Sequence, residues 1–368
     1  MYIKSIQLVN FKNYSEAEFA FSPEINCFVG KNGSGKTNVL DAIYYLSMCR
    51  SYLNPIDSQN IKFGESFFLL QSFWQKNDVE SEIYCSSKKG QKKIVKRNKV
   101  TYEKLADHIG LYPSVMISPY DRNLILEGSE VRRKWMDSTI SQFDRHYLDV
   151  LMRYSKVLDQ RNALLKNNHH SGFFDPESFD VWDEQLVSLG NVISKKRKTF
   201  LEDFIPLFQK YYSFLGEDNE EVSLTYISQL LETDFSILIQ ENRRKDLAVG
   251  YTTVGIHKDD LSFDLNTYPI KKFGSQGQQK SYLIALRLAQ YDCLKNHLGH
   301  SPILLLDDIF DKLDNLRVLR LMELVSNDTF GQVLVTDTDE LRLKEIFKKI
   351  KKNVQFFTVD DAKIIAHA

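Results

Sequence analysis

The stretch that decides the fold class of this chain is Gly30-Lys31-Asn32-Gly33-Ser34-Gly35-Lys36-Thr37. It matches the pattern G-x-x-x-x-G-K-[ST] at every fixed position. The apolar run Ile25 to Val29 before it predicts a buried strand, and the apolar spacing of Asn38 to Ser47 after it predicts a helix. A strand, a glycine-rich loop and a helix in this order form the phosphate-binding loop of P-loop NTPases. A tight turn without a ligand is the weaker interpretation, because both flanking elements agree with the loop.

A nucleotide is expected to bind along this loop. Glycines leave backbone N–H groups accessible to phosphate oxygens, and the helix N-terminus adds a positive dipole. Lys36 is expected to reach the β- and γ-phosphates, and the Thr37 hydroxyl is expected to bind Mg²⁺. The predicted nucleotide-binding residues are Gly30, Lys31, Asn32, Gly33, Ser34, Gly35, Lys36, Thr37 and Asn38.

A second segment, Ser301 to Asp308, is an apolar run that ends in two carboxylates. It has the form of a Walker B strand, in which Asp307 is placed to hold Mg²⁺ through water. Asp308 follows directly and is the predicted catalytic residue, which would orient or deprotonate the attacking water. Together with the loop, this segment predicts ATP and Mg²⁺ as cofactors.

A third segment, Gly274 to Lys280, opens an apolar helix and contains the S-x-G-Q core of the ABC signature. A serine hydroxyl and a glycine N–H at a helix N-terminus form an anion site. The tetrapeptide is a weak signal by itself. Its position ahead of a Walker B strand, in a chain with a Walker A loop, makes it a strong one. The signature residues are Ser275, Gln276, Gly277 and Gln278.

The composition agrees with a cytoplasmic nucleotide-binding protein. The length of 368 residues is enough for two domains and a large core. The contents of 43% hydrophobic and 26% charged residues are ordinary for a globular protein. No apolar run approaches the roughly 18 residues of a membrane span, and Met1 to Ser5 begins an alternating strand and not a signal peptide. The net charge of −1 means that any DNA contact must come from a local patch. The scattered cysteines predict neither a zinc site nor disulfides; they are Cys27, Cys49, Cys85 and Cys293.

The order of the expected elements predicts an α/β ATPase lobe made from both ends of the chain, with a helical lobe inserted between them. We expect ATPase segments at residues 1–120 and 249–368 and a helical arm at 121–248. Within the arm, apolar spacing predicts one helix from Val131 to Leu158 and a second from Trp182 to Leu207. The other expected elements are a helix at 235–247 and strands at 3–8, 18–21, 67–74, 82–85, 94–100, 114–117, 251–256, 260–265 and 332–336.

The motifs resemble a known group of proteins. Asn10 to Tyr14 after the first strand, and the loop followed by Leu40 to Ile43, resemble the opening of the SMC and RecF group of ABC-type ATPases. Three further segments are similar to the RecF family: Ser118 to Asp121 followed by Arg132-Arg133, the run Gly255 to Leu261, and Ser275 to Lys280. The family patterns usually have Pro at position 256, Arg at 258 and Glu at 120, where this chain has Ile256, Lys258 and Tyr120. The matching motifs cover nearly the whole chain, and the resemblance implies the fold of a P-loop NTPase of the ABC/SMC head type.

The resemblance also implies a function. It implies a DNA-binding ATPase that dimerises around two ATP molecules, works with a RecR-like partner at gapped, single-stranded or duplex DNA, and helps to load a recombinase during replication, repair and the SOS response. In such a dimer the signature from Ser275 to Gln278 acts on the nucleotide of the opposite protomer. The D-loop that crosses the interface would comprise Asp311, Leu313 and Asp314.

The catalytic machinery predicts slow hydrolysis. Val335 to Thr338 occupies the place where many ABC proteins have a switch histidine, and Asp308 replaces their common glutamate. Both features suit a switch better than a motor, and the resemblance implies that the ATPase activity is weak and stimulated by DNA.

Three basic or metal-like patterns have two interpretations each. Lys92, Lys93, Lys96 and Arg97 could follow a DNA backbone or form a solvated hairpin edge. The run Lys195 to Lys198 could contact DNA or simply face solvent. His257 beside Asp259 and Asp260 could hold a metal, although no second cluster has matching spacing.

The alternative function is that of an SMC-like ATPase from another branch, partnered with a nuclease in DNA repair or defence. A transporter ATPase subunit is disfavoured, because such subunits have Walker A and Walker B much closer together and need a membrane partner.

Overall fold

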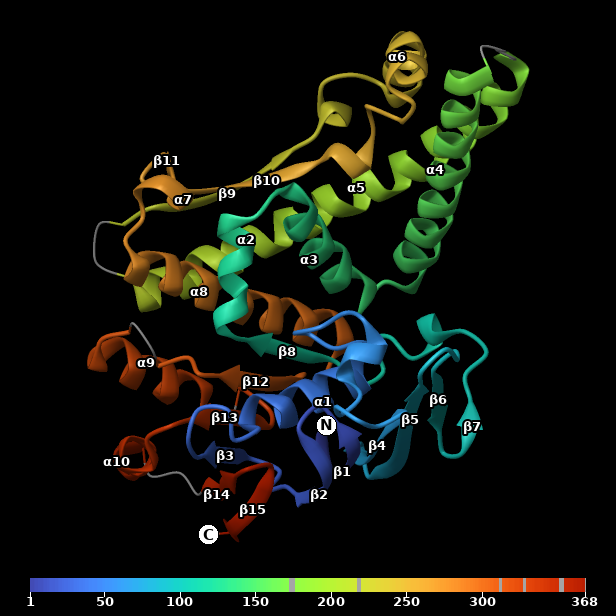
Figure 1. Cartoon of the computed structure of the whole chain (residues 1–368). Coiled ribbons are helices and arrows are strands. Elements are labelled where there is room, and N and C mark those ends of the chain that lie inside the picture. The colour runs from blue at the N-terminus through green and yellow to red at the C-terminus, as the bar shows by residue number, and fades with distance from the viewer. Residues whose placement is uncertain (172–175, 217–219, 311–312, 327–328, 351–353, 368) are drawn as a thin grey trace. The chain divides into compact units, whose positions relative to one another are not determined.

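The computed structural model describes residues 1–171, 176–216, 220–310, 313–326, 329–350 and 354–367. The chain forms two compact units (Figure 1). The first unit comprises Met1–Arg122, Tyr211–Glu217 and Ser275–Ala368, and the second comprises Asn123–Lys210 and Asp218–Gly274. Both ends of the chain thus belong to the first unit. Residues 249–274, which the sequence analysis assigned to the ATPase lobe, belong to the second unit.

A mostly parallel sheet forms one layer of the first unit. Its strand order is β15-β14-β3-β13-β12-β8, and the pairs are parallel except β14 with β15. Four of its strands are buried along their whole length, as strands covered on both faces must be. The carboxyl ends of these parallel strands meet at one edge. The strands are β3 (Ile25–Val29), β8 (Ser114–Ile117), β12 (Ile303–Asp307), β13 (Val333–Asp337), β14 (Val354–Asp360) and β15 (Lys363–His367).

An antiparallel sheet forms a second layer, with the order β2-β1-β4-β5-β6-β7. Helix α1 (Lys36–Met48) packs against strands of both sheets (Figure 1). Of its 13 residues 11 are buried, and the apolar ones among them belong to the common core. The helix that carries the phosphate-binding loop is therefore fixed on two sides. The strands are β1 (Tyr2–Phe11), β2 (Tyr14–Ala20), β4 (Phe67–Lys76), β5 (Val79–Lys88), β6 (Ile94–Arg97) and β7 (Val100–Thr101).

The described residues of the first unit also include three further helices, three short 3-10 helices and the end of α5 (Pro176–Leu215) from Tyr211. Helix α8 (Gln276–Leu298) packs against β8 and ends at Gly299 in a left-handed cap. The others are α9 (Asn315–Val325), α10 (Glu340–Ile350), η1 (Asp57–Asn60), η2 (Leu105–Asp107) and η3 (Pro119–Asp121). Within the described ranges, no helix is both long enough and apolar enough to cross a membrane.

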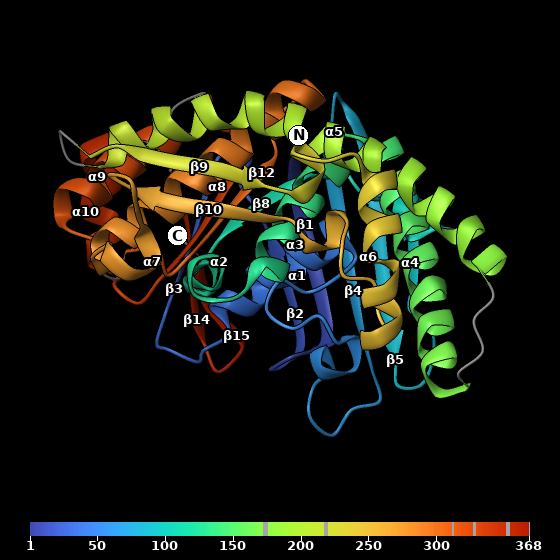
Figure 2. The same cartoon turned by 90° about the horizontal axis from the view of Figure 1, so that it is seen from above.

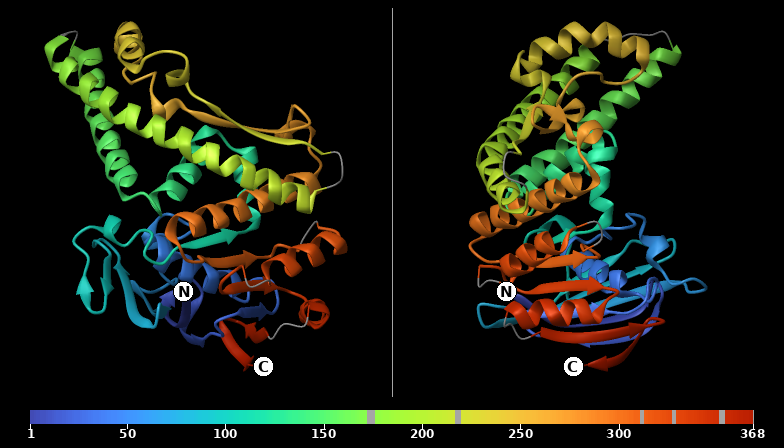
Figure 3. Two further views of the ribbon diagram at one scale, coloured as in Figure 1. Left: turned by 180° about the vertical axis from the view of Figure 1, so that it is seen from behind. Right: turned by 90° about the vertical axis from the view of Figure 1, so that its left-hand side faces the viewer.

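The second unit combines long helices with a three-stranded sheet. Strands β9 and β10 run antiparallel side by side (Figure 2), and β11 pairs with the other edge of β10. Helices α4 and α5 approach one another on either side of residues 172–175 (Figure 3), where Arg161 pairs with Asp183 at 2.6 Å. The elements are α2 (Arg122–Leu126), α3 (Ser129–Ser141), α4 (Arg145–Ser171), α5 (Pro176–Leu215), α6 (Phe235–Val249), α7 (Ile270–Phe273), η4 (Gln229–Leu231), η5 (Ile256–Lys258), β9 (Val222–Ile227), β10 (Asp260–Leu265) and β11 (Tyr268–Pro269).

Two expected elements of the second unit are wrong, and one strand was not predicted. The single helix from Val131 to Leu158 is two helices, because the Asp144 carboxylate accepts from the Tyr147 N–H at 2.9 Å and starts a new helix. The strand at 251–256 is absent from this described segment, since side chains bind its N–H groups, as Asp246 does that of Thr253 at 2.8 Å. Strand β9 was missed.

Candidate nucleotide site

The glycine-rich loop lies between β3 and α1, as predicted, and the hairpin of β1 and β2 packs against it. Gly35 has φ of 114°, and a Cβ there would lie 2.9 Å from both the Asn13 amide nitrogen and the Tyr14 hydroxyl. Only glycine therefore suits this position. Asn13, in the turn between β1 and β2, also accepts from the Asn38 amide at 2.7 Å. The motif at residues 10–14 thus supports the phosphate-binding loop, a role that sequence reasoning missed.

Lys36 closes the loop on itself. Its ammonium donates to the carbonyl oxygens of Gly30 and Lys31, both at 2.7 Å. Burial lowers the pKa of Lys36, although Asp308, Asp307 and Asp337 act in the opposite direction. The Ser34 hydroxyl oxygen is buried and has no hydrogen-bond partner among the described residues. A lysine ammonium and an unpartnered hydroxyl on one glycine-rich loop suit a phosphate group.

The Walker B strand meets the loop helix at a pair of oxygen ligands. The Thr37 hydroxyl donates to the Asp307 carboxylate at 2.7 Å, and the Thr336 hydroxyl donates to the same oxygen at 2.8 Å. Burial raises the pKa of Asp307, since the charged form is poorly solvated there. A hydroxyl and a carboxylate side by side are the oxygen ligands that Mg²⁺ takes in nucleotide sites, so these residues fit the expected ion.

Asp308 occupies a strained position in the described pocket. Its φ is 45°, which is uncommon for a residue with a side chain, and its N–H donates to the Thr336 hydroxyl at 3.0 Å. Asp308 is one of the residues that line a pocket with an open volume of about 500 Å³. The lining residues are Asn32, Gly33, Gly35, Lys36, Thr37, Asn38, Asp308, Thr336, Asp337 and Thr338. The structure thus brings Asp308 together with Lys36 and Thr37.

The segment in place of a switch histidine holds an ion pair. Asp337 is buried at the end of β13 and pairs with Arg342 of α10 at 2.5 Å. Its carboxylate also accepts from the Thr338 N–H at 2.6 Å. Asp337 and Thr338 line the pocket beside Asp308. Their position at the carboxyl end of a neighbouring parallel strand is the signal that could have identified them.

The signature residues lie at the N-terminus of α8. Ser275 and Gln278 form a reciprocal cap, in which the Ser275 N–H donates to the Gln278 side chain at 2.7 Å. Ser275 and Gln276 are exposed. No signature residue lines the nucleotide pocket in the part of the chain that the structure describes. In this chain, therefore, Ser275 is not brought to its own phosphate-binding loop.

The start of the D-loop lies outside the described residues, because Asp311 falls in the gap at 311–312. Beyond the gap, the exposed Asp314 caps α9 by accepting from the Arg317 N–H at 2.9 Å. A Cβ on Gly277 would lie 3.2 Å from the Arg317 guanidinium. The end of the D-loop, with Leu313 and Asp314, therefore lies next to the signature of the same chain.

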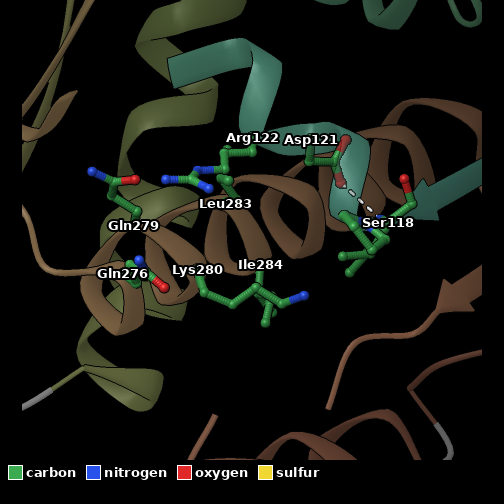
Figure 4. Close-up of a pocket in the computed structure, with 10 residues that line it drawn as sticks. Ser118, Asp121, Arg122, Gln276, Gln279, Lys280, Leu283 and Ile284 are labelled. Atoms are coloured by element: carbon green, nitrogen blue, oxygen red, sulfur yellow. Dashed lines mark hydrogen bonds between the residues drawn. The ribbon is translucent and has the colours of Figure 1, made fainter. Parts of the chain in front are cut away.

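A second pocket, with an open volume of about 570 Å³, lies between η3 and the first turns of α8 (Figure 4). Ile117, Pro119, Leu283 and Ile284 give it an apolar lining. Figure 4 shows Arg122 and Gln279 at one side of it and the bonded pair Ser118 and Asp121 at the other. The segment Ser118 to Asp121, which had no assigned role, thus lies beside the signature helix.

A buried ion pair links that segment to the same helix. Arg287 of α8 donates to Asp121 at 2.6 Å and to the Tyr52 hydroxyl at 2.7 Å, and Tyr52 also donates to Asp121. The Tyr52 N–H in turn donates to Asp41 of α1 at 2.7 Å. These contacts connect the nucleotide helix α1 with the signature helix α8 inside the first unit.

The four basic residues predicted for DNA do not form one face. Lys93 points inward, where it donates to the Cys49 carbonyl at 2.5 Å and pairs with Asp57 at 3.0 Å. In β6, Lys96 lies over the Tyr84 ring, while Arg97 points to the opposite face and lies over Tyr112. Lys92 is exposed. The set therefore divides between an internal contact and two faces of a sheet.

Comparisons with known proteins give one family. A model described as the RecF/RecN/SMC N terminal domain matches residues 2–364. The DNA replication and repair protein RecF of Flavobacterium johnsoniae is 53% identical over 359 residues, which cover 98% of this chain and 100% of that protein. The protein of the same name from Phocaeicola vulgatus is 50% identical over 366 residues, covering 99% and 98%.

Solved structures agree with these relatives. A structure of the recombination mediator protein RecF with ATP, in the RecFOR pathway, matches with a TM-score of 0.90 at 28% identity. The match covers 100% of this chain and 97% of that one. The Smc head domain of Pyrococcus furiosus, bound to the C-terminal domain of ScpA, matches with a TM-score of 0.58 at 16% identity and covers 100% and 96%. This second likeness concerns the fold, and it confirms the ABC/SMC head type.

Proposed function

We propose, since the chain belongs to the RecF family of DNA replication and repair proteins, that it is an ATP-gated DNA-binding protein of recombinational repair. The observation that carries the proposal is the nucleotide pocket. It unites Lys36 and Thr37 with Asp308, and the contact between Thr37 and Asp307 joins segments 270 residues apart. A fold that assembles these groups from both ends of the chain is built around a nucleotide.

In this proposal ATP binds with its phosphates on the loop from Gly30 to Asn38. Lys36 exchanges the carbonyls of Gly30 and Lys31 for phosphate oxygens, and Ser34 offers its buried hydroxyl. Thr37 and Asp307 would hold Mg²⁺, which supplies positive charge to the phosphate oxygens. Asp308 orients or deprotonates the attacking water, as a carboxylate in the lining of the pocket can. Slow turnover by this single carboxylate suits a switch.

The working unit in this proposal is a dimer that two ATP molecules hold together. The signature from Ser275 to Gln278 presents an exposed serine at a helix N-terminus, which is an anion site without a phosphate in its own chain. The γ-phosphate on the partner protomer would supply that anion. The D-loop, including Asp311, Leu313 and Asp314, would lie at the same interface. ATP hydrolysis would then allow the two protomers to separate.

The dimer would act in the cytoplasm on gapped, single-stranded or duplex DNA, with a RecR-like partner, to help load a recombinase. Support comes from the RecF relatives and from the RecFOR context of the matching ATP-bound structure. The nuclease-partnered alternative is not proposed, because these relatives match over nearly the whole chain at 53% and 50% identity.

A binding assay tests this function. Affinity for gapped, single-stranded and duplex DNA is measured with and without ATP across a salt series, in which the slope counts phosphate contacts. We expect ATP to increase DNA affinity. Equal affinity with and without ATP would contradict the ATP-gated account.

A further inference from the structure

The segment from Gly255 to Leu261, whose role the motifs left open, is held from inside the second unit. Arg197 of α5 is 1% exposed and donates to the Ile256 carbonyl at 2.8 Å and to the Asp259 carboxylate at 2.7 Å. Arg132 forms a bidentate pair with Asp260 at 2.6 and 2.9 Å. Both carboxylates are therefore bound to arginines, which argues against the metal interpretation. The basic run 195–198 is likewise not one solvent face, since Arg197 points inward.

The turn formed by the segment from Gly255 to Leu261 also packs closely against neighbouring side chains. Gly255 has φ of 120°, and a Cβ there would lie 2.7 Å from the Tyr154 hydroxyl and 2.8 Å from the Phe235 ring. His257 contacts the Tyr154 hydroxyl at 3.0 Å and the Thr252 carbonyl at 3.1 Å. These contacts fix the backbone of the turn, so a side chain that it directs outward is presented in a defined place.

Lys258 is that side chain. It is exposed, and its ammonium lies 5.1 Å from the ring centroid of Tyr251, which is 48% exposed. Across the described ranges, no carboxylate forms an ion pair with Lys258. The pKa of the neighbouring His257 is lowered to about 4, mainly by burial, and the positive charges of Lys258 and Arg133 act in the same direction.

We propose that Lys258 and Tyr251 form a contact for the phosphate backbone of DNA. Lysine ammonium and tyrosine hydroxyl groups are both common donors to phosphate oxygens. The chain carries a net charge of −1, so a DNA contact needs a local surface on which the protein's own cations neutralise the nearby carboxylates. The turn meets that need, because Asp259 and Asp260 face arginines while Lys258 faces solvent. This inference rests on the proposed DNA-binding function.

The test measures affinity for gapped DNA in the presence of ATP over about 50 to 200 mM salt. Lys258→Gln removes one phosphate contact, so the slope of log affinity against log salt should fall by about one. Affinity should fall roughly fivefold to tenfold near 0.1 M salt. Lys258→Arg should keep the wild-type slope, and Tyr251→Phe should weaken binding less than Lys258→Gln does.

Lys348→Gln is the matched control, because it makes the same charge change at an exposed position of α10 in the first unit. It should leave the slope unchanged, and all variants should bind ATP as the wild type does. A wild-type slope in Lys258→Gln would overturn the inference while leaving the proposed function intact. The same holds if Lys258→Gln loses an acidic protein partner but keeps its DNA affinity. Absence of DNA binding by the wild type would instead overturn the proposed function.

Discussion

The carbonyl oxygen of Val359 lies against Gly30, so closely that a Cβ on Gly30 would meet it at 2.1 Å. Three residues farther on, the Ala362 N–H donates to the Ser34 carbonyl at 2.8 Å. The turn between β14 and β15 therefore touches the phosphate-binding loop at both its first and its fifth residue. We interpret this turn as a brace that keeps the loop in its binding conformation.

The brace predicts an effect of Ala362 on ATP affinity. Ala362 has φ of 56°, which proline cannot adopt, and proline also lacks the N–H that binds Ser34. Ala362→Pro should weaken ATP binding roughly tenfold, the loss of about one hydrogen bond. Ala362→Gly keeps the N–H and suits positive φ, so it should bind ATP at least as well as the wild type. Titration calorimetry measures both, and wild-type affinity in a folded Ala362→Pro protein would refute the brace.

Lys36→Ala tests the phosphate contact itself. The substitution removes the ammonium that should bind the β- and γ-phosphates, a charge-assisted contact worth roughly 2–3 kcal/mol. ATP affinity should therefore fall by about one to two orders of magnitude. Lys348→Ala, at an exposed position of α10, is the control and should bind ATP nearly normally. Near-normal affinity in a folded Lys36→Ala protein would remove the basis of the nucleotide assignment.

Asp308→Asn tests the hydrolytic step. Asparagine tolerates the positive φ of this position, so the backbone should stay in place while the base is lost. Turnover should fall on the order of 100-fold, because a positioned general base contributes at least that factor. ATP should still bind, and the ATP-bound dimer should last longer. If single-turnover assays give the wild-type rate, Asp308 does not orient the water.

The sequence was sufficient where chemistry depends on local spacing. The loop from Gly30 to Thr37 and the pair Asp307-Asp308 are each contiguous, and the strands at 25–29 and 114–117 have their predicted bounds. The contacts made by Val359, Ala362 and Asn13 could not be predicted, because they depend on which distant hairpins pack beside the loop. Arg197 shows the same limit, since a basic run does not reveal which member meets buried carboxylates.

Stability of the first unit should depend on pH through His108. This side chain is fully buried and contacts the Leu46 carbonyl at 2.6 Å, and burial lowers its pKa from 6.5 to about 4. Between these values the unfolded chain binds more protons than the folded one, so stability rises with pH and is lost as pH falls. The loss from pH 7 to pH 5 should be about 2 kcal/mol for this residue.

Chemical denaturation of variants at both pH values checks this assignment. His108→Gln should show a smaller loss between pH 7 and pH 5 than the wild type, whatever its stability at pH 7. His146→Gln, at an exposed position of α4, should keep the full loss. An unchanged pH dependence in His108→Gln would show that His108 is not the group responsible.

The central claim is that two chains complete each other's nucleotide sites, and mixing two inactive variants tests it. Ser275→Arg keeps its phosphate-binding loop but puts a bulky cation at the signature, and Lys36→Ala keeps its signature but lacks the loop ammonium. Ser275→Asp is used as a second signature variant, because aspartate preserves the helix cap while its negative charge repels a phosphate. Each variant alone should hydrolyse little ATP.

In a mixed dimer, one composite site carries both lesions, and the other combines two intact halves. ATPase activity and dimer formation are measured together as the ratio of Ser275→Arg to Lys36→Ala is varied. We predict that activity is highest in the mixture and exceeds the sum of the separate variants. If mixed dimers form but show no activity above that sum, the composite site is contradicted. Ser275 would then act on the nucleotide that its own chain binds.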